Sequence, residues 1–167
     1  MSLTESPATA TPSAAVNVGV ISDTHGLMRP EALAALAGSD LIIHAGDIGS
    51  PEVVTALEHI APVHAIRGNV DRADWALRFS ETLAVEAGGL WLWVLHDVKT
   101  LDLDPSTAGF AAVISGHSHK PSEERKKGVL YLNPGSAGPR RFRLPVSLAR
   151  LMIDNREPRV EMIELQV

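Results

Sequence analysis

Seven residues of the types that bind divalent metals stand at the ends of short apolar runs. In an α/β protein, strand ends bring side chains from distant parts of the sequence into one crevice. Carboxylate, imidazole and amide groups together are the mixed oxygen and nitrogen donors that borderline divalent metals prefer. We therefore expect a two-metal site. Its expected ligands lie in the segments SDTHG, HAGDIG, RGNVD, VLHD and SGHSHK, and they are Asp23, His25, Asp47, Asn69, His96, His117 and His119.

The strength of this interpretation lies in the whole series, because each motif alone is weak. An Asp-x-His pair often occurs by chance, and a lone histidine beside an apolar run is more often a core or surface residue. Side chains two positions apart point the same way in an extended segment. Asp23 and His25 are therefore expected to hold one ion from one side, and His117 and His119 repeat this arrangement at another strand end.

Composition excludes several other kinds of protein. The chain has 167 residues, enough for one domain with a sizeable core, and it has no cysteine for a disulfide, a zinc-thiolate site or a thiol nucleophile. Its net charge of -5 gives no reason to expect long-range attraction of nucleic acid. No run approaches the ~18 apolar residues of a membrane span. Residues 1–15 are expected to be a disordered leader before a single domain at 16–167, and the expected location is the cytoplasm.

The elements that must position these residues alternate in the first half of the chain. Residues 16–22, 41–45 and 63–67 are short apolar runs, which are typical of buried parallel strands. Helix-start signals at Pro30 and at Ser50-Pro51 predict helices over residues 30–37 and 51–60. This half therefore has the order βαβαβ.

The second half is rich in predicted strands. A Gly88-Gly89 hairpin signal separates the first two of them, and the last two form a closing antiparallel pair. Residues 71–79 are predicted to be a loop with one short helix. Two mixed sheets packed together, with helices outside, would bury these runs best. The predicted strands are residues 82–86, 90–95, 111–115, 129–132, 146–153 and 159–165.

The series D-x-H, G-D, G-N, H, G-H-x-H resembles the metallophosphoesterase, or calcineurin-like, superfamily. The short length, the GN-x-D form of the third motif and the NPGS after the last motif are similar to its small single-domain branch, the YfcE-like phosphodiesterases. The resemblance covers residues 16–167 and implies a four-layer α/β/β/α sandwich with the metals above the strand ends. It implies three groups of ligands: Asp23, His25 and His119 for the first ion, Asn69, His96 and His117 for the second, and Asp47 as the bridge.

A site of this kind implies hydrolysis of a phosphodiester bond in a small substrate. Two ions ~3.5–4 Å apart lower the pKa of a bridging water, and the hydroxide attacks phosphorus in line with the leaving oxygen. Asp47, Asn69 and His96 are the ligands to which we assign the catalytic role. Two divalent ions are expected, manganese first, with iron, zinc, nickel or cobalt also compatible with these donors. Because histidine binds metal in its neutral form, metal affinity is expected to fall at low pH.

Two positions depart from the family pattern. Many members have GNH in the third motif, and that histidine helps to protonate the leaving group, whereas this chain has Val70. Valine cannot transfer a proton, so alkyl monoesters are expected to react poorly and diesters with acidic leaving groups to react better. His96 is followed by Asp97 instead of the more usual glycine. That carboxylate either adds negative charge or orients His96.

Four further residues could support the site. Asp71 is either a hydrogen-bond acceptor behind the ligands, which we prefer, or a simple turn residue. His44, three residues before Asp47, either orients a ligand or is a packed structural histidine. Arg140 and Arg141 belong either to a solvated loop or to a two-pronged phosphate clamp.

Other functions within this fold stay open. A scaffold or binding protein could keep the fold without turnover, and the retromer subunit is a precedent, although its pattern loses ligand residues that are present here. A phosphomonoesterase or a nuclease of the same superfamily is a further alternative. A nuclease would need a basic track, which only residues 140–143 offer, so long nucleic acid is not expected as a partner. An exposed pair formed by Trp91 and Trp93 would mark a contact between copies of the chain.

Overall fold

Ten β-strands form two five-stranded sheets in residues 15–167, the part of the chain that this computed structural model describes. The first sheet has the strand order β10-β9-β1-β2-β3, and the second has the order β4-β5-β6-β8-β7. The first 14 residues of the predicted leader lie outside the described residues. The predicted disorder of residues 1–15 therefore stays a prediction.

The first sheet is built around three parallel strands. β2 pairs in parallel with β1 and β3, whereas β9 pairs antiparallel with both β1 and β10. β1 and β2 are apolar on both faces, because one face meets the second sheet and the other meets helices. The strands are β1 Val16–Ile21, β2 Leu41–His44, β3 Val63–Ala65, β9 Ser147–Asp154 and β10 Glu157–Glu164.

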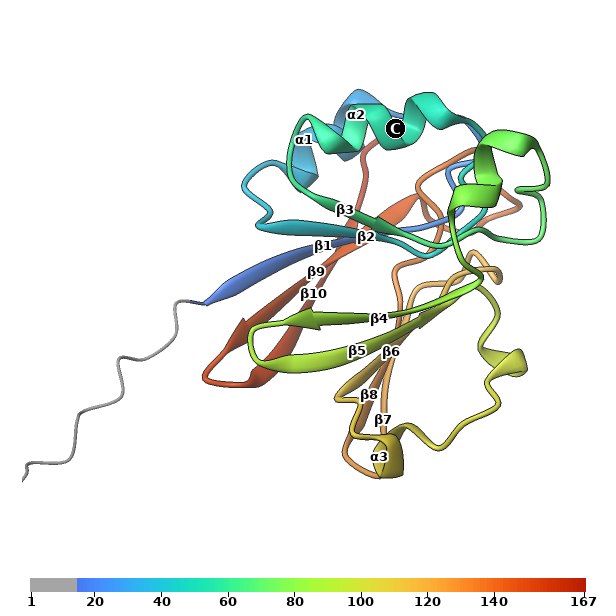
Figure 1. Cartoon of the computed structure of the whole chain (residues 1–167). Helices are drawn as coiled ribbons and strands as arrows, with labels where there is room; N and C mark the ends of the chain where they lie inside the picture. Colours follow the sequence, from blue (N-terminus) through green and yellow to red (C-terminus); the bar gives the residue numbers. More distant parts are fainter. Residues whose placement is uncertain (1–14) are drawn as a thin grey trace, which may run out of the picture.

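Two helices cover the outer face of the first sheet (Figure 1). They are α1, Pro30–Leu36, and α2, Pro51–Glu58, and each begins with the predicted proline, whose missing N–H costs nothing in the first turn. Leu36 of α1 and Leu57 of α2 are fully buried in one cluster with Ile42 of β2. The helices are therefore held on the sheet by apolar packing.

The second sheet also has a parallel centre, formed by β5, β6 and β8, with antiparallel strands at both edges. The sequence pattern does not predict β7, because its sequence SEERK is polar and fully exposed, as suits an edge strand. The predicted short helix in residues 71–79 is the 3₁₀ helix η1, Asp74–Arg78. The strands of the second sheet are β4 Thr82–Ala87, β5 Leu90–Leu95, β6 Ala112–Ile114, β7 Ser122–Lys126 and β8 Val129–Asn133.

The two sheets pack face to face through one buried apolar cluster, which includes Val20 and Ile43 from the first sheet and Val94 and Ile114 from the second. This arrangement is visible in Figure 1, where the two sheets lie one above the other. Among the described residues, no helix is both long and apolar enough to cross a membrane.

The outer face of the second sheet carries a thin fourth layer. It consists of the 3₁₀ helix η2, Val98–Thr100, the short helix α3, Pro105–Ala108, and the chain around them. Leu101 packs on this face, and the ring of Phe110 lies 5.2 Å from that of Trp93. The predicted α/β/β/α sandwich of two mixed sheets is confirmed, with its last layer reduced to single helical turns.

Candidate metal centre

The predicted ligands all follow the carboxyl ends of parallel strands. Because the two sheets face each other, the loops after these strands meet at one edge of the sandwich. Asp23 and His25 follow β1, Asp47 follows β2, Asn69 follows β3, His96 follows β5, and His117 and His119 follow β6.

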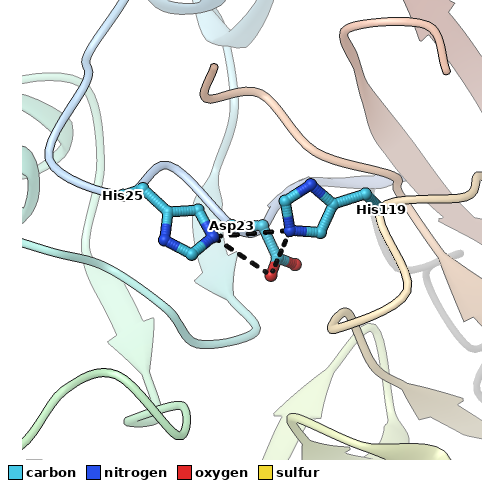
Figure 2. Close-up of side chains that lie close together, drawn as sticks. All are labelled: Asp23, His25 and His119. Atoms are coloured by element: carbon cyan, nitrogen blue, oxygen red, sulfur yellow. Dashed lines mark hydrogen bonds and ion pairs between the residues drawn. The ribbon is translucent and has the colours of Figure 1, made fainter. Parts of the chain in front are cut away.

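Six of these residues form two clusters. In each cluster, one potential ligand atom per residue lies within 4.8 Å of the others. Figure 2 shows the first cluster, in which Oδ1 of Asp23 lies 3.2 Å from Nε2 of His119 and 3.8 Å from Nε2 of His25. The second cluster consists of Asp47, His96 and His117.

Asp47 connects the two clusters. Its Oδ2 atom lies 3.2 Å from Nε2 of His96, in its own cluster, and 3.7 Å from Nε2 of His25, in the other. Nε2 of His96 is also 3.8 Å from Oδ1 of Asp23. The carboxylate of Asp47 therefore lies close to histidines of both clusters.

Asn69 and His117 lie at the open side of the centre. Both side chains are exposed, and together with His96 they line a cleft of about 440 Å³, here called the Asn69 cleft. A second cleft of about 390 Å³, the Arg141 cleft, lies beside it, lined by Lys99, Arg141, Asn133, Ser118 and Tyr131 among others. Asp97 and His117 line both clefts.

Buried polar atoms without partners mark the centre as a cation site. Oδ1 of Asp23 and Nε2 of His96 are buried. Each has polar neighbours, but none of these contacts has the geometry of a hydrogen bond. The other oxygen of Asp23, Oδ2, accepts hydrogen bonds from Oγ of Ser22 and from N of His117. Leaving a buried carboxylate oxygen unpaired is costly. Divalent ions would satisfy both atoms, and the donor set fits such ions.

The hydrogen bond of His96 leaves one ring nitrogen ready to bind metal. Its Nδ1 lies 2.7 Å from the carbonyl oxygen of Ala45, so Nδ1 carries the proton and donates it. In the neutral ring the lone pair is then on Nε2, the nitrogen that faces both carboxylates. Fixing the tautomer through the second ring nitrogen is a general feature of metal-binding histidines.

Clustered charges set the protonation of the centre. Burial alone would raise the pKa of Asp47, but its contact with His96 and the charge of that imidazole lower the pKa below its ordinary value. Burial would lower the pKa of His96, but Asp47 and Asp23 together raise it. For His119, burial lowers the pKa, Asp23 opposes this effect, and Arg141 adds to it. The lowered pKa of His119 favours its neutral form, which is the form that binds metal.

Five of the seven predicted ligands adopt left-handed backbone conformations. Such a conformation is uncommon for residues other than glycine, and it clusters at functional sites. The extended geometry that the sequence spacing suggested is therefore wrong, because these pairs lie on turns. His117 and His119 lie in different clusters, as the family resemblance implied, whereas Asp23 and His25 share one cluster. The φ angles are Asp23 55°, His25 47°, Asp47 55°, His117 70° and His119 62°.

Two glycines allow the loops to approach one another. A Cβ atom on Gly68 would collide with Oδ1 and N of Asp47. One on Gly116 would collide with Oγ of Ser22 and lie 2.5 Å from Oδ2 of Asp23. The backbone of each loop therefore contacts an aspartate that a larger residue would displace.

Of the two predicted alternatives for Asp71, the structure has it as a hydrogen-bond acceptor. Its buried carboxylate accepts backbone N–H bonds from Ile48, Gly49 and Gly68, each at 2.9 Å. It therefore joins the loop that carries Asp47 to the loop that carries Asn69.

His44 has a similar connecting position. Its ring is fully buried, and burial lowers its pKa to about 3, with the nearby His96 adding to the effect. The N–H of Gly46 donates to Nδ1 at 3.1 Å, so the proton is on Nε2, which lies 3.0 Å from Oγ1 of Thr24. Thr24 donates in turn to the carbonyl oxygen of Ile48. His44 thus connects the two ligand loops through Thr24 and Gly46, and its predicted role in orienting a ligand stays a prediction.

The two predicted arginines have different positions. Arg141 lines the cleft named after it, beside His117, and its charge reaches His119. Arg140 instead donates to the carbonyl oxygen of Val167, at 3.4 Å, and lines neither cleft. The carboxylate of Asp97 lies 3.8 Å from Nε2 of His117.

Sequence reasoning missed two supporting residues. Nδ2 of Asn133 donates to the carbonyl oxygen of Gly116 and to Oγ of Ser118, which fixes the GHSH loop. Oγ of Ser136 donates to the carbonyl oxygen of Asp23. The NPGS segment was a usable signal, because both residues belong to it, but only the fold brings that turn next to the ligand loops.

The chain belongs to the calcineurin-like phosphoesterase superfamily. The model of that superfamily domain matches residues 16–156. A curated protein of Methanothermobacter thermautotrophicus, named "Probable metallophosphoesterase", is 34% identical over 158 residues, which are 87% of this chain and 91% of that protein. The predicted superfamily is therefore confirmed.

Solved structures have the same fold. A predicted phosphoesterase from Streptococcus pneumoniae superposes with a TM-score of 0.72 at 25% identity, over 90% of each chain. The phosphoesterase YfcE from E. coli has a TM-score of 0.65 at 20% identity, over 90% of this chain and all of its own. Vps29 of Entamoeba histolytica in complex with zinc has a TM-score of 0.70 at 22% identity, over 90% and 100%.

Proposed function

We propose that this protein hydrolyses phosphodiester bonds in small molecules with the help of two divalent metal ions. The observation that carries the proposal is the pair of buried, unpartnered atoms Oδ1 of Asp23 and Nε2 of His96. These atoms lie 3.8 Å apart, and Nε2 of His96 is also 3.2 Å from Oδ2 of Asp47. Membership of a phosphoesterase superfamily supports the chemistry, and the presence of all seven predicted ligand residues supports turnover.

The proposed ligand sets are those implied by the family resemblance. Two ions in such a centre lower the pKa of bound water and neutralise phosphate oxygens. We propose manganese first, with iron, zinc, nickel or cobalt as alternatives, because the set is rich in imidazoles. The first set is Asp23, His25 and His119, the second is Asn69, His96 and His117, and Asp47 is shared.

The chain's own residues bind and orient the substrate. In the reaction, a water oxygen bonds to phosphorus, one phosphorus–oxygen bond breaks, and the leaving alcohol takes up a proton. Arg141 lines the cleft beside His117, which supports the proposal that it pairs with a phosphate group of the substrate. Val70 follows Asn69 at the open side, is 47% exposed and has no proton to give. We therefore propose diesters with acidic leaving groups as the preferred substrates.

A non-catalytic role is the second candidate. The likeness to Vps29 supports it, because the chain shares its fold with a protein that is not named as a phosphoesterase. Measuring both the metal content and the rate of ester hydrolysis distinguishes the two candidates. Protein that is loaded with metal and hydrolyses no ester would favour the binding role.

The test uses bis(4-nitrophenyl) phosphate and 4-nitrophenyl phosphate, with protein reconstituted in manganese. We expect the diester to react faster than the monoester, and Asp47→Ala to lose at least ~100-fold in rate, as do variants that remove a group acting on the transition state. Asp74→Ala, an exposed aspartate on η1, is the matched control and should keep the wild-type rate. An active Asp47→Ala variant would remove the proposed bridge.

The remaining expectations stay proposals. We propose a cytoplasmic location, a small substrate and no long nucleic acid. Trp91 is exposed and Trp93 is partly buried against Phe110. A contact between copies of the chain through this pair stays a proposal.

A further inference from the structure

The two clefts beside the metal centre share a ridge. Asp97 and His117 line both, and the nearest oxygen and nitrogen of these two side chains are 3.8 Å apart. The Asn69 cleft contains Asn69 and His96, so a phosphate bound at the metals lies on that side. A substrate that crosses the ridge at His117 reaches the Arg141 cleft with its other end.

The Arg141 cleft carries cations that have no anionic partner. Lys99 and Arg141 form no ion pair with any of the residues that the structure describes, 15–167. The third cation of the cleft, Lys126, is different, because its Nζ pairs with Glu124 at 3.4 Å. Of the two acidic groups in the lining, Glu124 is thus engaged by Lys126. Asp97 lies at the ridge and accepts the backbone N–H of Lys99.

A hydroxyl donor accompanies these cations. Oγ of Ser118 accepts hydrogen bonds from Nδ2 of Asn133 at 3.1 Å and from the backbone N–H of Lys120 at 3.2 Å. Both bonds use its lone pairs, so the hydroxyl hydrogen can be donated to a ligand. Lysine and arginine bind phosphate through charge-assisted hydrogen bonds, and a hydroxyl group can donate a further hydrogen bond to it.

The Asn69 cleft has the opposite character. Its arginine, Arg67, lies 3.7 Å from Glu81 and also donates to the carbonyl oxygen of Phe79. Asp102 adds a further negative charge, and Trp93 adds an aromatic surface. This cleft suits an uncharged organic group and disfavours an additional phosphate.

We propose that the Arg141 cleft is a binding site for a second phosphate group of the substrate. The substrate class is then a phosphodiester in which one ester arm carries an additional phosphate and the other arm is uncharged. Lys99 and Arg141 bind the additional phosphate, while the uncharged arm occupies the Asn69 cleft. This inference rests on the proposed function for the identity of the reacting group, but the phosphate site itself can be tested without turnover.

The test compares matched ligands by isothermal titration calorimetry on the manganese-loaded protein. The pairs are 1,3-propanediol bisphosphate with its monophosphate, and thymidine 3′,5′-bisphosphate with thymidine 5′-monophosphate. We expect wild type to bind at least one bisphosphate about 10-fold more tightly than its monophosphate. Lys99→Met and Arg141→Met should each reduce that ratio to below about 3-fold. Lys127→Met, in the β7–β8 turn outside both clefts, is the matched control and should keep it.

The inference would be overturned if wild type bound each bisphosphate and its monophosphate with equal affinity. It would also be overturned if Lys99→Met and Arg141→Met both kept the wild-type ratio of bisphosphate to monophosphate affinity. Thermal unfolding of each variant shows whether it is folded. Hydrolysis is measured separately with bis(4-nitrophenyl) phosphate. A protein that binds bisphosphates through Lys99 but hydrolyses no ester keeps this site and loses the proposed function. A protein that hydrolyses the diester but binds bisphosphates no more tightly than monophosphates keeps the proposed function and loses this site.

Discussion

Nε2 of His44 lies 3.0 Å from Oγ1 of Thr24, and this hydrogen bond links the end of β2 to the loop between Asp23 and His25. The second nitrogen of the ring accepts the N–H of Gly46. One neutral imidazole therefore positions the two loops that carry both aspartates of the centre. A protonated ring would have no acceptor at Nδ1 and would break the bond to Gly46.

The pKa of His44, about 3 in the folded protein, predicts a loss of stability in acid. Between about pH 3 and pH 6.5 the unfolded chain binds a proton that folded His44 does not, so stability falls as pH drops through this range. The slope from one such group is at most about 1.4 kcal/mol per pH unit. Urea unfolding in EDTA at pH 5 and pH 7 should show a shallower pH dependence for His44→Gln than for wild type. The exposed His59→Gln should behave as wild type, and an unchanged slope in His44→Gln would contradict the assignment.

Replacement of Asp71 should destabilise the protein without touching a ligand. Asp71→Asn puts an amide N–H₂ against backbone N–H groups of Ile48, Gly49 or Gly68, which leaves at least one of them unpaired. An unsatisfied buried donor costs about 1–3 kcal/mol. Urea unfolding of the metal-free protein measures this change, with the exposed Asp74→Asn as control. A variant of wild-type stability would show that Asp71 is only a turn residue.

Metal ions should stabilise the fold through Asp23. A ligand present at ~100 times its Kd stabilises the folded state by about 2.7 kcal/mol. Manganese should therefore raise the Tm of EDTA-treated wild type and raise that of Asp23→Asn much less, because the substitution removes the anionic charge of buried Oδ1. His59→Ala serves as control. The same Tm increase in Asp23→Asn and in wild type would place the ions elsewhere.

Val70→His should improve the reaction of poor leaving groups. The N–H of residue 70 donates to Oδ1 of Asp47 at 3.1 Å, and this backbone bond is independent of the side chain. A general acid contributes about 10²- to 10⁴-fold, so we expect at least ~10-fold faster phosphate release from glycerol 3-phosphate. The hydrolysis rate of 4-nitrophenyl esters should change little, because 4-nitrophenolate leaves without protonation.

Val70→Gln is the matched control, because glutamine has similar size and polarity but cannot transfer a proton. An equal gain in Val70→Gln would assign the effect to binding. No gain in Val70→His would show that another group protonates the leaving oxygen.

Much of the fold can be predicted from the sequence, because buried strands and helix starts are local signals. The apolar run at 16–22 and the prolines at 30 and 51 mark β1, α1 and α2 closely. β7 has no such signal, since an exposed polar edge strand is recruited by pairing with β8. The thin fourth layer also depends on packing, here of Leu101 and Phe110 on the second sheet.

For the candidate site, residue types and their order along the chain indicate which donors follow which strands, because chain order fixes which loop each residue occupies. Tertiary structure alone decided how they meet. His117 and His119 lie in different clusters although they are two residues apart, and Oδ2 of Asp47 lies 3.7 Å from a histidine of one cluster and 3.2 Å from a histidine of the other. It also separated Arg141 from Arg140 and brought Asn133 behind the GHSH loop. These distinctions depend on side-chain direction and on contacts between distant segments, which residue type and spacing do not specify.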